Sequence, residues 1–183
     1  MSTSKDEVLT LEPLIEAVRE GVEARGWELS GLQKTTSHHF EGRWTGDSTR
    51  SAYLFFHRAS GPDWASLDVY LDETTRGLSG DLALVVDGRT LSGFGGVSEA
   101  LETLARLAGD VLPEGYRRPL TVRFRLDAPH DDPAGASSEI RFKLRLPKSA
   151  LDAGRGALAA LASATAASFN RLLADPRLEA FLD

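Results

Sequence analysis

The chain has 183 residues, of which 42% are hydrophobic and 26% are charged, and this composition is typical of a soluble globular protein. Such a length is enough for one domain with a hydrophobic core, so we expect a single domain over residues 1–183. The formal net charge of −6 argues against general nucleic-acid binding, and the lack of cysteine excludes disulfides and fits a cytoplasmic location.

The chain also lacks the patterns that direct a protein to a membrane. No stretch approaches the roughly twenty consecutive apolar residues that a membrane-spanning helix needs. The first seven residues do not have the basic and then apolar layout of a signal peptide. We therefore expect no membrane partner, and we expect residues 1–8 to be flexible.

The first segment with a clear pattern is residues 11–25, which predict an amphipathic helix. Leu14 and Val18 belong to an apolar stripe at helical spacing, with glutamates between its members. Alternation is only partial over residues 27–44, which predict one long strand or two short strands. The last of these is expected to pair with the following strand through a turn at residues 45–48.

Three further strands follow one another in quick succession and predict the centre of a sheet. They are expected at residues 51–58, 65–73 and 80–86. The first is apolar on both faces, which is typical of an interior strand, and the short connections require antiparallel pairing. Asp87 and Gly88 predict a tight hairpin turn, which leaves room for a further short strand at residues 89–92.

The second half of the chain predicts a helix, two strands and two more helices. The apolar stripe of the first helix consists of Leu101, Leu104, Leu107, Ala108 and Val111. The alternating apolar residues of the strands are Leu120, Val122, Phe124 and Leu126, then Ile140, Phe142, Leu144 and Leu146. Their linker at residues 127–138 is acidic and rich in Pro, Gly and Ser, which indicates a mobile loop. Residues 149–174 predict an alanine-rich helix, and Asp175 and Pro176 begin a short final helix over residues 176–183.

Together these elements predict an α+β fold, in which helices pack on one face of an antiparallel sheet. The predicted element order is α-β(3–5)-α-β2-α. The small residues of the helix over residues 149–174 permit close packing, either onto the sheet or against a second copy of the chain.

The most informative candidate site is a set of basic side chains on the two C-terminal strands, which we call the basic ladder. It consists of Arg123, Arg125, Arg141, Lys143 and Arg145. All of them lie on the face opposite the apolar residues, where adjacent like charges repel. A binding surface for an acidic partner or a phosphate backbone is one interpretation. The favoured interpretation is structural, because Asp68 and Asp72 on a neighbouring strand are placed to neutralise the ladder.

Aromatic side chains form a second candidate on that same face. Strand alternation turns Tyr53, Phe55 and Tyr70 away from the core. Solvent, a partner protein or a ligand pocket are the alternatives for what covers them. A pocket would favour a ligand-binding α+β domain with an apolar cavity between the sheet and the long C-terminal helix.

Other patterns favour structure over chemistry. The glycine-rich run at residues 93–98 precedes a helix, but a tight turn is favoured over an anion site. His57 is expected to be structural, although an acid–base pair with Asp68 or Asp72 is an alternative. The remaining histidines, His38, His39 and His130, form no metal-binding pattern. Trp27, Trp44 and Trp64 are expected to cover the core. We therefore predict a protein without catalytic residues, cofactor or metal.

The element order, together with the acidic character, resembles the secretion-chaperone-like fold of class I type III secretion chaperones and YbjN-like proteins. The resemblance spans residues 11–174 and rests on element order, so it carries no functional residues over to this chain. It implies a small, dimeric, non-enzymatic protein that binds another protein on an exposed sheet or helix surface. We therefore expect a cytoplasmic protein-binding module, chaperone-like or adaptor-like. A small-ligand-binding domain and a nucleic-acid-associated protein that uses the basic ladder are the alternatives.

Overall fold

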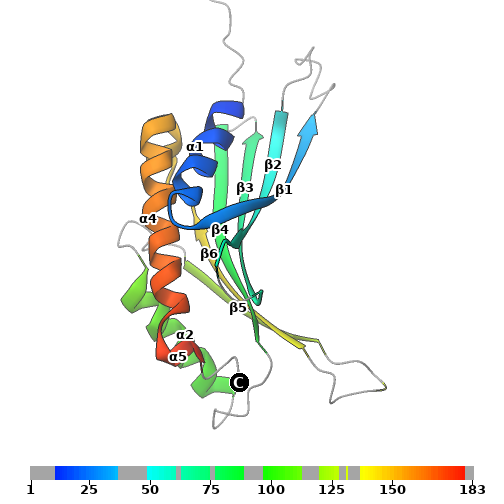
Figure 1. The fold of residues 1–183 in the computed structure, drawn as a ribbon, viewed down its shortest axis with the longest axis vertical. Helices are drawn as coiled ribbons and strands as arrows, with labels where there is room; N and C mark the ends of the chain where they lie inside the picture. Colours follow the sequence, from blue (N-terminus) through cyan, green and yellow to red (C-terminus); the bar gives the residue numbers. More distant parts are fainter. Residues whose placement is uncertain are drawn as a thin grey trace, which may run out of the picture.

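The computed structural model describes residues 11–36, 49–60, 63–74, 77–88, 97–112, 120–127, 131 and 137–179. This part of the chain contains five helices and six strands (Figure 1). In chain order they are α1 (Glu12–Glu23), β1 (Trp27–Thr36), β2 (Thr49–Arg58), β3 (Ala65–Thr74), β4 (Gly77–Gly88), α2 (Val97–Val111), β5 (Leu120–Asp127), β6 (Ser137–Arg145), α3 (Lys148–Asp152), α4 (Arg155–Leu173) and α5 (Pro176–Glu179). None of the described helices is long and apolar enough to cross a membrane.

The six strands form one antiparallel sheet with the order β1-β2-β3-β4-β6-β5. Strands β1 to β4 follow each other as a meander. The chain then passes through α2, and β5 returns beyond β6, so that β6 is the strand that pairs with β4. The sheet and the order of its elements confirm the predicted α+β fold.

One face of the sheet, which we call the inner face, carries the hydrophobic core. Leu54, Val69 and Leu82 are neighbours across β2, β3 and β4, and each is at most 1% exposed. Burying a side chain of this size stabilises the fold by roughly 1.5–3 kcal/mol. Figure 1 shows α1, α2 and α4 together on one side of the sheet, and Phe169 of α4 belongs to the same core. No described helix or strand covers the opposite side, which we call the outer face.

Helices α1 and α4 approach each other closely because both carry small residues where they meet. Gly21 of α1 is buried, and a Cβ atom at this position would collide with the carbonyl oxygen of Ala159 in α4. The same atom would lie 3.0 Å from the Cβ of Ala162. The small-residue face of α4 is therefore occupied by α1 of the same chain.

Polar contacts from α4 hold the turn between α1 and β1. Trp27 is 1% exposed, and its indole Nε1–H donates a hydrogen bond of 3.0 Å to Oδ1 of Asn170. The amide nitrogen of Asn170 donates to the carbonyl oxygen of Arg25 at 2.9 Å. Gly26 follows with a φ of 80°, in the left-handed region that glycine adopts at little cost. These contacts confirm that Trp27 covers the core.

The structure corrects the predicted end of the third central strand. Asp87 and Gly88 do not form a hairpin turn, because they continue β4 and pair with Glu139 and Ser138 of β6. A turn dipeptide can remain extended when both neighbouring strands offer it backbone partners. The predicted loop over residues 127–138 is shorter for a related reason, since both of its ends belong to β5 and β6.

The helices also differ in detail from the prediction. Residues 149–174 form two helices, since the chain turns at Gly154, whose φ is 87°. Leu101 is 44% exposed, and the neighbouring Ala100 faces the core in its place at 3% exposure. The predicted cap of the final helix is confirmed, because Asp175 accepts a hydrogen bond from the backbone of the second helical residue at 2.9 Å.

Some predictions fall on residues outside the described part of the chain. They concern the flexible start, the second half of residues 27–44, the short strand at residues 89–92, the glycine-rich run before α2, most of the loop at residues 127–138, and the end of the final helix. Trp44, His38, His39 and His130 lie there as well.

Candidate functional site

The outer face carries its side chains in rows that run across the strands. One row consists of Tyr53, Tyr70, Asp81 and Arg145, on β2, β3, β4 and β6. The next row consists of Phe55, Asp68, Ala83 and Lys143 on the same strands. A third row consists of His57, Ser66, Val85 and Arg141, followed by Arg123 on β5. The fold thus brings the predicted aromatic candidates onto one face with four members of the basic ladder, Arg123, Arg141, Lys143 and Arg145.

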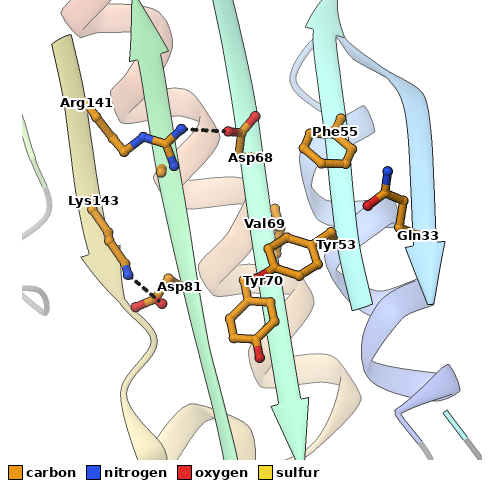
Figure 2. A pocket seen from close by; sticks show the side chains of 10 residues that line it. Gln33, Tyr53, Phe55, Asp68, Val69, Tyr70, Asp81, Arg141 and Lys143 are labelled. Carbon is orange, nitrogen blue, oxygen red and sulfur yellow. Dashed lines mark hydrogen bonds and ion pairs between the residues drawn. The ribbon is translucent and has the colours of Figure 1, made fainter. Parts of the chain in front are cut away.

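A hollow of about 380 Å³ lies on this face, and we call it the outer-face hollow (Figure 2). Its lining consists of Gln33, Tyr53, Phe55, Asp68, Val69, Tyr70, Asp81, Ala83, Arg141 and Lys143. A small lining residue, Ala83, leaves the space open between larger neighbours, and a glycine on β1 lets the Phe55 ring lie close to that strand. Gly31 stands opposite Phe55, where a Cβ atom would already lie 3.3 Å from the ring, and Ala83 stands between Asp68 and Lys143.

One wall of the hollow is aromatic. The rings of Tyr53 and Tyr70 contact each other across β2 and β3, with centroids 4.4 Å apart and planes inclined by 32°. Tyr53 and Phe55 lie two residues apart on β2, with nearly parallel rings and centroids 6.4 Å apart. Tyr53 is 43% exposed, although it is an interior-strand residue, so its ring presents a large apolar area to solvent.

The opposite wall is charged and carries ion pairs. Nη2 of Arg141 lies 3.4 Å from Oδ2 of Asp68, and Nζ of Lys143 lies 3.1 Å from Oδ2 of Asp81. Figure 2 shows both pairs as diagonals, each joining β6 to a strand of the meander in the adjacent row. Glu139 adds a second carboxylate 3.5 Å from Nε of Arg141.

These ion pairs show which members of the basic ladder are neutralised within the chain. Arg141 and Lys143 are neutralised within the chain, as the structural interpretation predicts, and Asp68 is one of the expected partners. Asp72 is not a partner, because its neighbour on β4 is Ser79, which lies beyond Asp81, where the pairing of β4 with β6 ends. No described carboxylate lies within ion-pair distance of the exposed Arg123 and Arg145, and the side chain of Arg125 lies outside the described part.

The electrostatic environment of the hollow shifts two of its titratable groups. Burial raises the pKa of Asp68, and this effect outweighs the opposing influences of the Arg141 guanidinium and of a hydrogen bond from Ser66. Burial also raises the pKa of the Tyr70 phenol, and the neighbouring carboxylate of Asp72 adds to this increase. Tyr70 is therefore partly withdrawn from solvent and lies beside a carboxylate that accepts a hydrogen bond from its hydroxyl.

The histidine candidate does not form the alternative acid–base pair. Nε2 of His57 lies 3.4 Å from Oε2 of Glu28 on β1, and both side chains are more than half exposed. Asp68 is held by Arg141 instead. Among the described residues, no group of three or more His, Cys, Asp or Glu side chains is arranged to hold a metal ion. The arrangement is suited to binding, through aromatic rings beside charges.

Sequence patterns did not mark every residue of the hollow. Asp81 follows the alternation of its strand and points outward, which is the signal that could have identified it. Ala83 had no such signal, because its importance depends on which larger side chains lie opposite it in the folded sheet.

Comparisons of the chain with protein-family models, with curated proteins and with solved structures find no significant match.

Proposed function

We propose that the protein is a non-enzymatic protein-binding module, chaperone-like or adaptor-like, whose partner docks on the outer face of the sheet. The observation that carries this proposal is the exposed aromatic wall of the outer-face hollow. Tyr53 keeps 43% of its surface in solvent beside Tyr70 and Phe55. Large aromatic side chains at a concave surface are common anchors of protein interfaces, because they gain much apolar burial at a small entropic cost.

The charged wall supports the same proposal. Protein interfaces commonly surround an apolar centre with polar groups that exclude water. Here the pairs Asp68–Arg141 and Asp81–Lys143 stand beside the aromatic wall, and their cationic side chains remain 34% and 41% exposed. Partly exposed charges of this kind can exchange their partners when a protein docks.

A small-ligand-binding domain is the second candidate, and the size of the hollow favours it. Ligand sites commonly enclose about 300–1,000 Å³ and bury most of the ligand surface. The outer-face hollow reaches that volume, but its aromatic wall stays open to solvent at Tyr53. A docked protein surface covers such an open wall better than a small molecule does.

Nucleic-acid binding is a weaker candidate. A phosphate backbone needs unpaired cations. Asp68 and Asp81 neutralise Arg141 and Lys143, which leaves only Arg123 and Arg145 of the described ladder side chains without a carboxylate at ion-pair distance. The proposal locates the protein in the cytoplasm, which the absence of cysteine supports.

The proposal includes a homodimer, which the secretion-chaperone-like resemblance implies. Light scattering at low and high salt is expected to give a mass of twice the 19.8 kDa of one chain. A mass of one chain at both salt concentrations would contradict the dimer. It would not test docking on the outer face, which the crosslinking experiment tests.

The docking surface can be tested by photo-crosslinking in native cells. We expect benzoylphenylalanine at position 53 to give a protein adduct of defined mass. The matched control carries the same group at position 16, which is exposed on α1 at the helical side of the fold. Adducts from position 16 and none from position 53 would show that the partner docks on the helices, and adducts from neither position would contradict protein binding.

A further inference from the structure

We propose that the tyrosine end of the outer-face hollow binds an arginine side chain of the partner protein. This inference rests on the proposed function, because it names the chemistry that the docking surface recognises. This end of the hollow is lined by Tyr53 and Tyr70, and Asp72 lies beside it as the next outward-facing residue of β3 after Tyr70.

The geometry offers both a ring face and a carboxylate to one incoming group. Tyr53 is the most solvent-open of the aromatic residues that line the hollow, with 43% exposure. Asp72 is half-buried, and its neighbours across the strands are Ser51 on β2 and Ser79 on β4. Because both neighbours have short side chains, the carboxylate remains reachable from the Tyr53 and Tyr70 rings.

Charge at this end is distributed unevenly, because the exposed Arg145 stands on β6, two strands from Tyr70, and the carboxylate of Asp72 has no described cation beside it. Asp68 and Asp81 hold Arg141 and Lys143, whereas no described cation lies within ion-pair distance of Asp72. Burial is the first cause of the raised pKa of Tyr70, and the carboxylate of Asp72, to which the Tyr70 hydroxyl is hydrogen-bonded, adds to the increase. The net charge of −6 further favours the approach of a basic partner.

Arginine satisfies these features better than other side chains do. Its planar guanidinium stacks on a tyrosine ring by cation–π attraction and can donate two parallel hydrogen bonds to one carboxylate. A lysine provides the charge without the planar contact. An uncharged apolar side chain would leave the Asp72 carboxylate without a counter-charge.

The inference can be tested with defined peptides and the full-length protein. The probe is a seven-residue peptide of alternating threonine and valine with a central arginine, and its control carries the neutral isostere citrulline. We expect backbone amide NMR signals around Tyr53, Tyr70 and Asp72 to shift on titration. Citrulline is expected to weaken binding at least about fivefold, which corresponds to the loss of a surface cation–π contact and an ion pair.

Variants separate recognition from folding. Asp72→Asn is expected to weaken binding of the arginine peptide because the ion pair is lost, and to leave the smaller preference over citrulline that stacking on the tyrosine ring provides. Binding of the citrulline peptide is expected to stay unchanged. Asp152→Asn makes the same chemical change at an exposed site on α3, and it is expected to alter neither affinity. Thermal unfolding of both variants shows whether either one is misfolded, and a misfolded Asp72 variant would be replaced by Tyr53→Ser.

Equal binding of the two peptides, or signal shifts away from β2 and β3, would overturn the inference. Crosslinking from position 53 without any arginine preference would leave the proposed function intact and refute this recognition chemistry alone. Arginine-dependent shifts around Asp72 without any crosslinked partner would support the site and contradict the proposed function.

Discussion

The close crossing of α1 and α4 makes a quantitative prediction about Gly21. In Gly21→Ala the new methyl group would meet the carbonyl oxygen of Ala159 and would lie 3.0 Å from the backbone nitrogen of Ser163. A backbone group cannot rotate away, so the helices must separate, and overpacking of this kind costs about 1–3 kcal/mol. We place this substitution at the upper end of that range. Alanine offsets about 1 kcal/mol of the loss through its higher helix propensity.

The expected net loss for Gly21→Ala is therefore about 2 kcal/mol, which lowers Tm by about 4–8 °C in a chain of this size. Gly109→Ala is the matched control, because a Cβ at this site in α2 would have no described neighbour within 4 Å. It is expected to stabilise the protein by up to about 1 kcal/mol. Denaturant unfolding of both variants measures the difference. A Gly21 variant as stable as the parent would refute the close crossing.

Three further predictions concern the α1–β1 turn and the outer face. Asn170→Ala leaves the buried indole N–H of Trp27 without its hydrogen-bond partner and is expected to lower the unfolding free energy by about 1–3 kcal/mol. Denaturant titration measures this loss, and an unchanged free energy would mean that the indole is not held by this contact. Ala83→Phe is expected to fill the outer-face hollow and abolish crosslinking from position 53, with Tm within about 2 °C of the parent; unchanged crosslinking would show that the partner does not enter the hollow. The third prediction concerns Asp68, whose folded-state pKa is raised above 3.8, chiefly by burial, so that the folded state binds more protons than the unfolded state between these two values. The unfolding free energy of the parent is therefore expected to fall, relative to that of Asp68→Asn, as pH rises from below 3.8 through the folded-state pKa. Thermal unfolding scans of both proteins over this pH range measure the difference. A difference that rises with pH would contradict the burial argument.

Local patterns were sufficient for much of the fold. In β3, Leu67 and Leu71 alternate with Asp68 and Asp72, and this period of two predicts both a strand and the face that it buries. The helical spacing in residues 11–25 likewise predicted α1. Prediction was weaker where a residue can serve two structures, as at Gly88, since the presence of β6 beside β4 keeps that glycine in the sheet.

The sequence by itself determined the elements, the inner face and the candidate side chains, because these depend on spacing along the chain. Only the tertiary structure decided which charges meet. The register of the strands places Asp81 one row from Lys143, with which it pairs. Asp72 lies beyond the last paired row of β4 and β6 and is left without a described cation. The outer-face hollow arises in the same way, because Ala83 leaves space only when folding sets it beside larger side chains on other strands.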